Sequence, residues 1–325
     1  MALVTDGIYL IDEGVVGEKR ASCVYLVMGE RAALVDVGPT KRAMALPERL
    51  RELDIDAGKI DYILLTHIHV DHAGAAGYLC QLYPNALVVV HQAGARHLID
   101  PSKLVEGTRA AFGPEAEVAN GPVVPMQAER MVVVTGGEVI DLGAGRRLRV
   151  IDTPGHASHH LCFYDEWTRG IFTGEGMGVY HRGLDMGLPT IAPPLFDVFA
   201  AVASIRKMAS FGPERFYYAH GGARENVEGA PERLVDAILN WAETTRQAMR
   251  EDSDPANVVA RLRLRAAEEL RTLARARGVV APLPNDVGLD FWGLMEFFNK
   301  FGLDVDLTGL REGEQGCVSS PRVSI

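Results

Sequence analysis

Three histidines and one aspartate that can bind metal stand within six residues of the sequence, at His67, His69, Asp71 and His72. They directly follow a short apolar stretch, Tyr62–Leu65, that has the composition of a buried strand. In extended chain, side chains two residues apart point to the same side, so His67 and His69 can hold one ion together. Asp71 and His72 lie past the bend and can turn toward a second ion. Imidazole nitrogens and carboxylate oxygens suit Zn²⁺, and also iron and manganese, so the spacing predicts a metal site.

Four further segments accompany this cluster, and together the five motifs resemble the metallo-β-lactamase superfamily of metal-dependent hydrolases, in its glyoxalase II and lactonase branch. The first motif of that family is HxHxDH. A turn that carries Asp36 corresponds to one that buttresses the family's site without binding metal. The four other motifs occur in the family's order over residues 1–225, at Val35–Gly38, Asp152–His156, Phe172–Glu175 and Tyr218–Gly222.

The resemblance implies a ligand set for two divalent metal ions, zinc first, with iron and manganese as alternatives. Glu175 stands where the family normally has the aspartate that bridges the two ions, and its side chain is one methylene longer. We expect Glu175 to bridge them, and the alternative is that it hydrogen-bonds to a ligand histidine. The first ion is assigned to His67, His69 and His156, and the second to Asp71, His72 and His220.

The same resemblance implies hydrolysis by a metal-bound hydroxide. Two ions about 3.5–4 Å apart create such a nucleophile and clamp the substrate oxygen. Water bound to zinc has a pKa near 7, so no serine or cysteine nucleophile is needed. Asp71 is the residue expected to orient this water and pass on its proton. Tyr180, in a loop after Glu175, is a candidate to assist the carbonyl oxygen, because lactonase members use a tyrosine beyond the bridging carboxylate.

The other histidines are assigned smaller roles. His159 and His160 enter a predicted strand, where neighbouring side chains point to opposite sides, so at most one of them faces the site. By resemblance to the glyoxalase II branch we choose His160 as the one beside a ligand, with an ordinary half-buried histidine as the alternative. His91 and His97 are expected to be structural or on the surface.

The elements that must position these residues alternate between strands and helices, which predicts an α/β fold with helices outside a sheet core. The resemblance implies the family's four-layer αββα sandwich. A helix over Thr40–Leu53 is expected to begin with Thr40 as its N-cap, and two more cover Ala73–Leu82 and Phe196–Phe211. Predicted strands are Ile8–Ile11, Ser22–Met28, Ala32–Asp36, Tyr62–Leu65, Leu87–Val90, Val139–Leu142, Arg147–Asp152, Leu161–Tyr164, Gly170–Thr173 and Phe216–Tyr218.

The character of the sequence changes near residue 225, where long helical patterns begin. We therefore expect a catalytic domain over 1–225, a helical region over 226–310 that caps the active site, and a flexible tail over 311–325. The Arg-rich stretch Arg261–Arg277 is interpreted as a solvated helix face. Asp290 is expected to be an N-cap, and the predicted helices are Glu232–Arg250, Ala256–Arg277 and Phe291–Phe301.

Composition limits the function classes. The 325 residues carry a net charge of −10 with a pI of about 5.5, which argues against a nucleic-acid binder held by phosphate contacts. We read neither a signal peptide nor an apolar run long enough to span a membrane, and the four cysteines lie far apart. These features predict a cytoplasmic protein with reduced thiols and a small-molecule substrate, and a possible homodimer through Phe291–Phe301.

The leading functional hypothesis is hydrolysis of an ester, lactone or thioester. An oxidative alternative is a persulfide dioxygenase, which uses a single iron on two histidines and one aspartate of the same scaffold. A nuclease is the third candidate, and a non-catalytic relative is the last, because every ligand position holds a competent residue. The fold alone does not fix the substrate.

Overall fold

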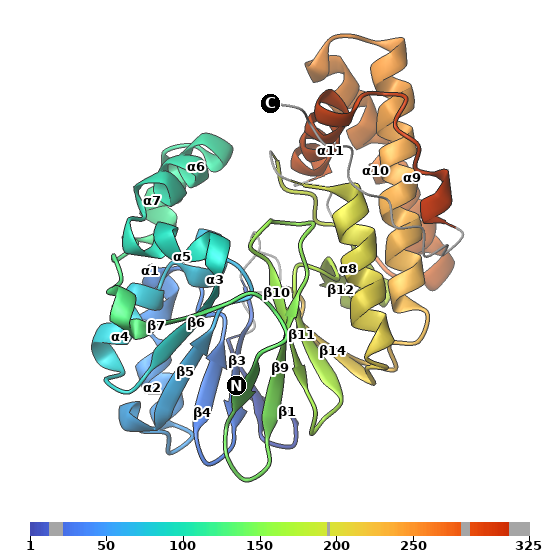
Figure 1. Ribbon diagram of the computed structural model, residues 1–325. Helices are drawn as coiled ribbons and strands as arrows, with labels where there is room; N and C mark the ends of the chain where they lie inside the picture. Colours follow the sequence, from blue (N-terminus) through green and yellow to red (C-terminus); the bar gives the residue numbers. More distant parts are fainter. Residues whose placement is uncertain (13–21, 194–195, 281–286, 312–325) are drawn as a thin grey trace.

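The computed structural model describes residues 1–12, 22–193, 196–280 and 287–311, and these form two β-sheets that face each other with helices outside both (Figure 1). One hydrophobic cluster lies between the sheets, around Phe163 and Leu64. Another lies between the first sheet and its helices, and a third between the second sheet and the C-terminal helices. The predicted four-layer αββα sandwich with a helical C-terminal extension is confirmed. The predicted tail lies outside the described residues beyond Arg311, as does Cys317.

The first sheet has its strands in sequence order. The first four are antiparallel, and the last four run parallel to one another. Parallel strands end at the same edge of a sheet, so the loops that follow β4, β5 and β6 lie at one edge. The strands are β1 (Ala2–Thr5), β2 (Ile8–Asp12), β3 (Val24–Met28), β4 (Ala32–Val35), β5 (Ile60–Leu64), β6 (Leu87–His91) and β7 (Met131–Val134).

The second sheet has the order β15-β14-β11-β10-β9-β8. Strand β10 is antiparallel to both β9 and β11, and β11 is parallel to β14. Strands β9, β11 and β14 therefore run in the same direction and end at the same edge. The bounds are β8 (Val139–Asp141), β9 (Arg147–Asp152), β10 (Leu161–Asp165), β11 (Gly170–Gly174), β14 (Arg215–Tyr218) and β15 (Ala223–Glu225), and a separate hairpin pairs β12 (Val179–His181) with β13 (Met186–Leu188).

The helices on the first sheet differ from the prediction in two places. The expected helix over Thr40–Leu53 is two helices, α1 (Thr40–Ala43) and α2 (Leu46–Arg51), because Pro47 has no N–H to donate and its ring clashes with the carbonyl of residue 43. Thr40 is not an N-cap: it lies inside α1, and its hydroxyl donates to Gly74 O at 3.0 Å.

The helix expected over Ala73–Leu82 is also divided. Helix α3 (Val70–Ala73) already includes two of the predicted ligands, and α4 (Ala76–Leu82) follows after a break. Sequence patterns did not assign the next three helices, α5 (Gln92–Ile99), α6 (Ser102–Phe112) and α7 (Glu115–Asn120). Neither α6 nor α7 contains a buried residue, so the apolar periodicity that marks a core-facing helix is weak there. Helix α6 contacts α3.

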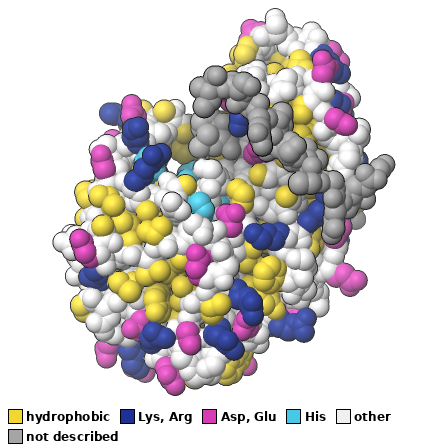
Figure 2. Space-filling model, viewed as in Figure 1, with side chains coloured by type: hydrophobic (Ala, Val, Ile, Leu, Met, Phe, Trp, Pro, Cys, Tyr) yellow, Lys and Arg dark blue, Asp and Glu magenta, His cyan; other side chains and the backbone are white. Residues whose placement is uncertain are grey.

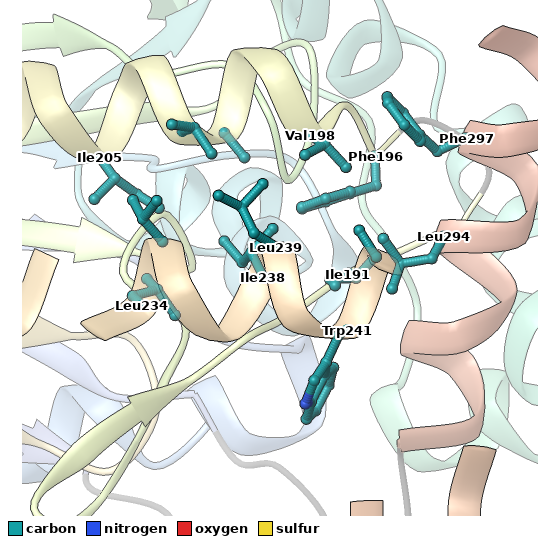
Figure 3. Close-up of a cluster of buried hydrophobic side chains, with 14 of the residues drawn as sticks. Ile191, Phe196, Val198, Ile205, Leu234, Ile238, Leu239, Trp241, Leu294 and Phe297 are labelled. Carbon is teal, nitrogen blue, oxygen red and sulfur yellow. The ribbon is translucent and has the colours of Figure 1, made fainter. Parts of the chain in front are cut away.

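The C-terminal helices pack on the second sheet through α8 (Val198–Ser210). They are α9 (Ala230–Glu251), α10 (Pro255–Arg277) and α11 (Val287–Phe301), close to the predicted ranges. Figure 3 shows Val198 of α8, Ile238 of α9 and Leu294 of α11 converging on one cluster. Asp290 is in the first turn of α11 and not at its N-cap, because the helix begins at residue 287. No described helix is both long and apolar enough to cross a membrane.

A buried arginine that pairs with an aspartate of the second sheet also connects the two sheets. Arg146, in the loop between β8 and β9, has its Nη2 2.8 Å from Asp165 Oδ2, and both side chains are buried. Its Nη1 donates to Asp6 O at 3.0 Å and to Met28 O at 2.9 Å, which belong to the first sheet and its turns. Arg146 therefore connects the layers through charge-assisted hydrogen bonds.

Candidate metal centre

The seven predicted ligands come from four segments, one that follows a strand of the first sheet and three that follow strands of the second. The loop after β5 carries His67 and His69 and leads into α3, which carries Asp71 and His72. The loops after β9, β11 and β14 carry the other three, which are His156, Glu175 and His220. Because these three strands run in one direction, their following residues meet at one edge of the sheet.

The structure brings all seven side chains together in two groups. Within each group, one ligand atom from every residue lies within 4.8 Å of the others. The first group adds Glu175 to the predicted ligands of the first ion, and the second is the predicted set for the second ion. The groups are His67, His69, His156 and Glu175, and Asp71, His72 and His220.

Glu175 reaches both groups. Its Oε2 lies 2.8 Å from His156 Nε2 and 3.5 Å from His67 Nε2, in the first group. The same oxygen is 3.8 Å from His72 Nε2, and Oε1 is 3.6 Å from His220 Nε2, in the second group. The carboxylate therefore stands between the groups, where a bridging ligand belongs.

The backbone before Glu175 is tightly fixed. Gly174 has φ +51°, in the left-handed region, and a Cβ there would lie 2.5 Å from His160 Nε2. The N–H of Glu175 donates to His160 Nε2 at 3.2 Å. His160 Nδ1 must then carry the ring proton, and it donates to Thr153 Oγ1 at 2.9 Å. His160 thus supports Glu175 through its backbone.

Asp36 supports the loop that carries the histidines. Its carboxylate accepts hydrogen bonds from Thr66 N at 2.8 Å and from His72 Nδ1 at 2.9 Å. The Thr66 hydroxyl also donates to Asp36, at 2.8 Å, so it accepts from His67 Nδ1 at 3.1 Å. His156 Nδ1 donates to Thr190 O at 3.1 Å. Each of these rings is held by Nδ1, which leaves the Nε2 electron pair facing the centre.

The electrostatics of the site suit a cation. Burial, followed by the neighbouring His72 and His69, lowers the pKa of His67 well below its usual value, and burial with His156 lowers the pKa of His69 to about 4. These two rings are therefore neutral and can donate electron pairs. Burial alone would raise the pKa of Glu175, but His156 and other histidines hold it well below its usual value, so this carboxylate is ionised.

The second group behaves differently because two carboxylates, Asp71 of the group and Asp36 behind it, lie beside His72. Burial would lower the pKa of His72, but Asp71 and Asp36 raise it well above its usual value. Burial would raise the pKa of Asp71, yet His72 and His220 lower it. Within the described part of the chain, the buried Nε2 of His72 has no well-aligned hydrogen-bond partner, although Asp71 Oδ2 lies 3.3 Å from it. A buried nitrogen without such a partner, in a set of imidazoles and carboxylates, fits a metal ion such as zinc.

The open side of the centre is marked by two side chains. Asp71 is 38% exposed and His69 is partly exposed, whereas the other five are buried. In the space-filling view, histidine side chains are visible in a recess between the part with α5–α7 and the part with α8–α11 (Figure 2). A substrate would therefore approach from the side of Asp71 and His69.

Tyr180 lies close to the centre through its backbone. Its N–H donates to His220 O at 3.0 Å, and its ring stacks on Tyr218 with 5.1 Å between centroids. Its hydroxyl donates to Asp185 Oδ1 at 3.0 Å. The catalytic role of Tyr180 stays a prediction.

Sequence patterns did not identify Thr66 and Thr190 as parts of the site. Thr66 contributes a hydroxyl and Thr190 a backbone carbonyl, and neither carries a residue-type signal for metal chemistry. The remaining histidine near the centre, His159, stacks at 6.3 Å on His67, and burial lowers its pKa to about 3.

Comparison with known proteins identifies similar sequences and folds. The family model described as the metallo-beta-lactamase superfamily matches residues 16–220. Metallo-beta-lactamase fold-containing protein ST1585 from Sulfurisphaera tokodaii is 32% identical over 221 residues, which cover 66% of this chain and 78% of that protein. Its crystal structure, described as from Sulfolobus tokodaii, superimposes with a TM-score of 0.60 and 28% identity, covering 72% of this chain and 86% of that one.

Two further proteins extend the comparison. Acyl-coenzyme A thioesterase MBLAC2 from Homo sapiens is 29% identical over 188 residues, 52% of this chain and 63% of that protein. Other curated relatives are matched over about half of their length. The structure of TTHA1429 from Thermus thermophilus has a TM-score of 0.68 at 23% identity, over 92% of this chain and 95% of that one, so the fold likeness includes C-terminal helices.

Proposed function

Because the chain belongs to the metallo-β-lactamase superfamily, we propose that it is a hydrolase that uses two zinc ions to cleave a thioester, an ester or a lactone. The observation that carries this proposal is the position of Glu175 between two groups of ligand side chains. Its carboxylate can be shared by two ions, which is the arrangement of a binuclear hydrolytic site. Among the three substrates we favour the thioester, and the name of the human relative, an acyl-coenzyme A thioesterase, supports this choice.

Two ions held there would lower the pKa of water and polarise the substrate carbonyl. The chain's own residues supply the rest. Asp71 Oδ2 lies 3.3 Å from His72 Nε2 and 3.6 Å from His220 Nε2, and it faces the open side. It can accept a hydrogen bond from the attacking water, orient it and take its proton. Glu175, buried behind it, keeps the two groups at a fixed separation.

A thioester suits this set of side chains. A thiol has a pKa near 8.5, so the thiolate leaves without a strong proton donor. The Tyr180 hydroxyl, the candidate helper from the sequence, donates to Asp185. Because this hydroxyl is already engaged by Asp185, the other side chains of the site would act without a proton donor for the leaving group. Of the three substrates, the thioester needs such a donor least.

Metal analysis combined with a substrate panel tests the proposal. The purified chain is expected to contain two zinc ions and to hydrolyse N-acetylcysteamine thioesters faster than matched esters and lactones. His67→Ala should lose metal and activity, whereas His97→Ala, a change on α5 outside both ligand groups, should lose neither.

Three outcomes would contradict the proposal. One iron ion per chain with oxygen uptake on glutathione persulfide would indicate the dioxygenase. Cleavage of structured RNA at low enzyme concentration, without acyl hydrolysis, would indicate the nuclease. Unchanged metal content in His67→Ala would place the metal elsewhere.

A further inference from the structure

The carbonyl that accepts the hydrogen bond of His156 shares its peptide group with an N–H that donates to a carboxylate. His156 Nδ1 donates to Thr190 O at 3.1 Å, and Ile191 N donates to Asp290 Oδ1 at 2.7 Å. Asp290 is on α11, 99 residues further along the chain than Ile191. A single peptide plane therefore lies between a candidate metal ligand and an acidic residue of the C-terminal helices.

All parts of this connection are shielded from water. The exposed fractions are 5% for His156, 6% for Thr190 and 4% for Asp290. A carboxylate buried to this degree loses its hydration and is costly unless it accepts hydrogen bonds. Hydrogen bonds to a charged acceptor are short, which agrees with the 2.7 Å distance. Asp290 is in the first turn of α11, where the positive end of the helix dipole stabilises a negative charge.

The close approach of α11 depends on a glycine. A Cβ at Gly293, one turn after Asp290, would lie 2.6 Å from Ile191 O. The Ile191 side chain is fully buried and lies beside Leu294 in Figure 3. The missing side chain at 293 thus lets α11 hold the 190–191 peptide group in place from the side opposite to His156.

We propose that Asp290 positions and polarises His156 through the Thr190–Ile191 peptide group. A carboxylate on the N–H of a peptide group increases the negative charge on its carbonyl oxygen, because hydrogen bonds in a chain polarise one another. The stronger acceptor holds the His156 proton on Nδ1 and makes Nε2 a better electron-pair donor, as a carboxylate does when it contacts a metal-bound histidine directly. Asp290 is therefore a positioning residue, and α11 takes part in building the first ligand group.

Metal affinity is the direct test, and it needs no substrate. Zinc binding is measured by competition with a chelator, and cobalt(II) absorption reports the ligand environment. Asp290→Ala should lower the affinity for one of the two metal ions about tenfold and leave the affinity for the other unchanged. The affected ion should be the one that His156→Ala loses. Asp290→Asn keeps an oxygen acceptor, so it should bind within about threefold of wild type but shift the cobalt spectrum.

Two further variants make the result decisive. Gly293→Ala should weaken the binding of the same ion, because α11 must move away from Ile191. Asp304→Ala, an exposed carboxylate after α11, should bind like wild type. The inference would be overturned if Asp290→Ala bound both metal ions as tightly as wild type. It would also be overturned if Asp290→Asn and Gly293→Ala weakened the binding of both metal ions equally. If Asp290→Ala does not fold, Asp290→Asn and Gly293→Ala decide.

The inference rests on the proposed function only in that His156 is a metal ligand. A chain that binds metal in this pattern but hydrolyses no acyl substrate would refute the hydrolase and keep the role of Asp290. If the wild-type chain hydrolyses thioesters and the Asp290→Ala variant binds both metal ions as tightly as wild type, the hydrolase is kept and the role of Asp290 is refuted.

Discussion

At the scale of single residues, the longer side chain of Glu175 sets the geometry of the centre. Its two oxygens lie between 2.8 and 3.8 Å from four histidine nitrogens. Its backbone cannot adjust freely, because Gly174 has a left-handed conformation and His160 accepts the Glu175 N–H. Because the backbone cannot shift, the length of the Glu175 side chain determines where its carboxylate lies.

Glu175→Asp should consequently weaken metal binding, although aspartate is the usual residue of the family. The shorter side chain withdraws the carboxylate from His72 and His220, which belong to the second group. We expect about tenfold weaker binding of the second equivalent, measured by chelator competition. Glu175→Gln serves as the matched control of equal length, and tighter binding by the aspartate variant would contradict this reading.

His160 should matter for stability as well as for Glu175. Replacing it by alanine leaves the Glu175 N–H without its buried acceptor and removes the imidazole hydrogen bond to Thr153, at a cost of about 2–4 kcal/mol. Burial, followed by the charge of His156, lowers the pKa of His160 well below its usual value. In the unfolded chain His160 is protonated below about pH 6.5, whereas in the folded state it stays neutral to a lower pH. The free energy of unfolding therefore falls as the pH drops below about 6.5.

The pH dependence of His160 is tested with the metal-free protein. Urea denaturation at pH 7 and pH 5 should show that His160→Gln loses less stability on acidification than wild type does. The glutamine oxygen can still accept from Glu175 N–H, so the variant should fold. An identical loss in both proteins would assign the acid sensitivity to other groups.

The seven side chains that the structure brings together could be predicted from the sequence because each lies in a motif with a distinctive residue type. Thr66, Thr190 and Asp290 could not, because their roles depend on a hydroxyl, a backbone carbonyl and a contact across 99 residues. The sequence predicts that Asp290 caps its own helix, and instead it accepts a hydrogen bond from a distant loop. Such partners become visible only when the fold has brought them together.

At the scale of elements, strand direction explains how the site is assembled. Apolar runs in the sequence located most strands, because buried strands need them. They did not reveal β1, β7, the short hairpin of β12 and β13, or β15, which are brief or lie at sheet edges. The split of the helix over Thr40–Leu53 could have been predicted from Pro47 alone.

The hairpin gives Tyr180 a different environment from the one expected. Asp185 accepts a hydrogen bond from its hydroxyl at 3.0 Å and also pairs with Arg224, whose Nε is 3.0 Å away. If the hydroxyl serves mainly to hold the hairpin, Tyr180→Phe and Asp185→Asn should each lower kcat by less than about tenfold with zinc content unchanged. A loss of about 100-fold in Tyr180→Phe alone would assign the hydroxyl to the reaction.

At the scale of the whole molecule, the two sheets are joined by charge as well as by apolar packing. Removing one partner of a buried pair leaves the other uncompensated, so Arg146→Met should lower the free energy of unfolding by about 3–5 kcal/mol. Chemical denaturation measures this, with Arg147→Met as the exposed neighbour for comparison. A change below about 1 kcal/mol would show that the pair contributes little.

Helices α6 and α7 stand apart from this architecture, since they bury no residue and yet α6 contacts the helix that carries Asp71 and His72. Mutations there escape the constraint that a packed core places on sequence change. We therefore expect the segment 102–120 to tolerate substitution better than the loops that carry the candidate ligands. In laboratory selection for new substrates, this is the part of the chain to randomise first.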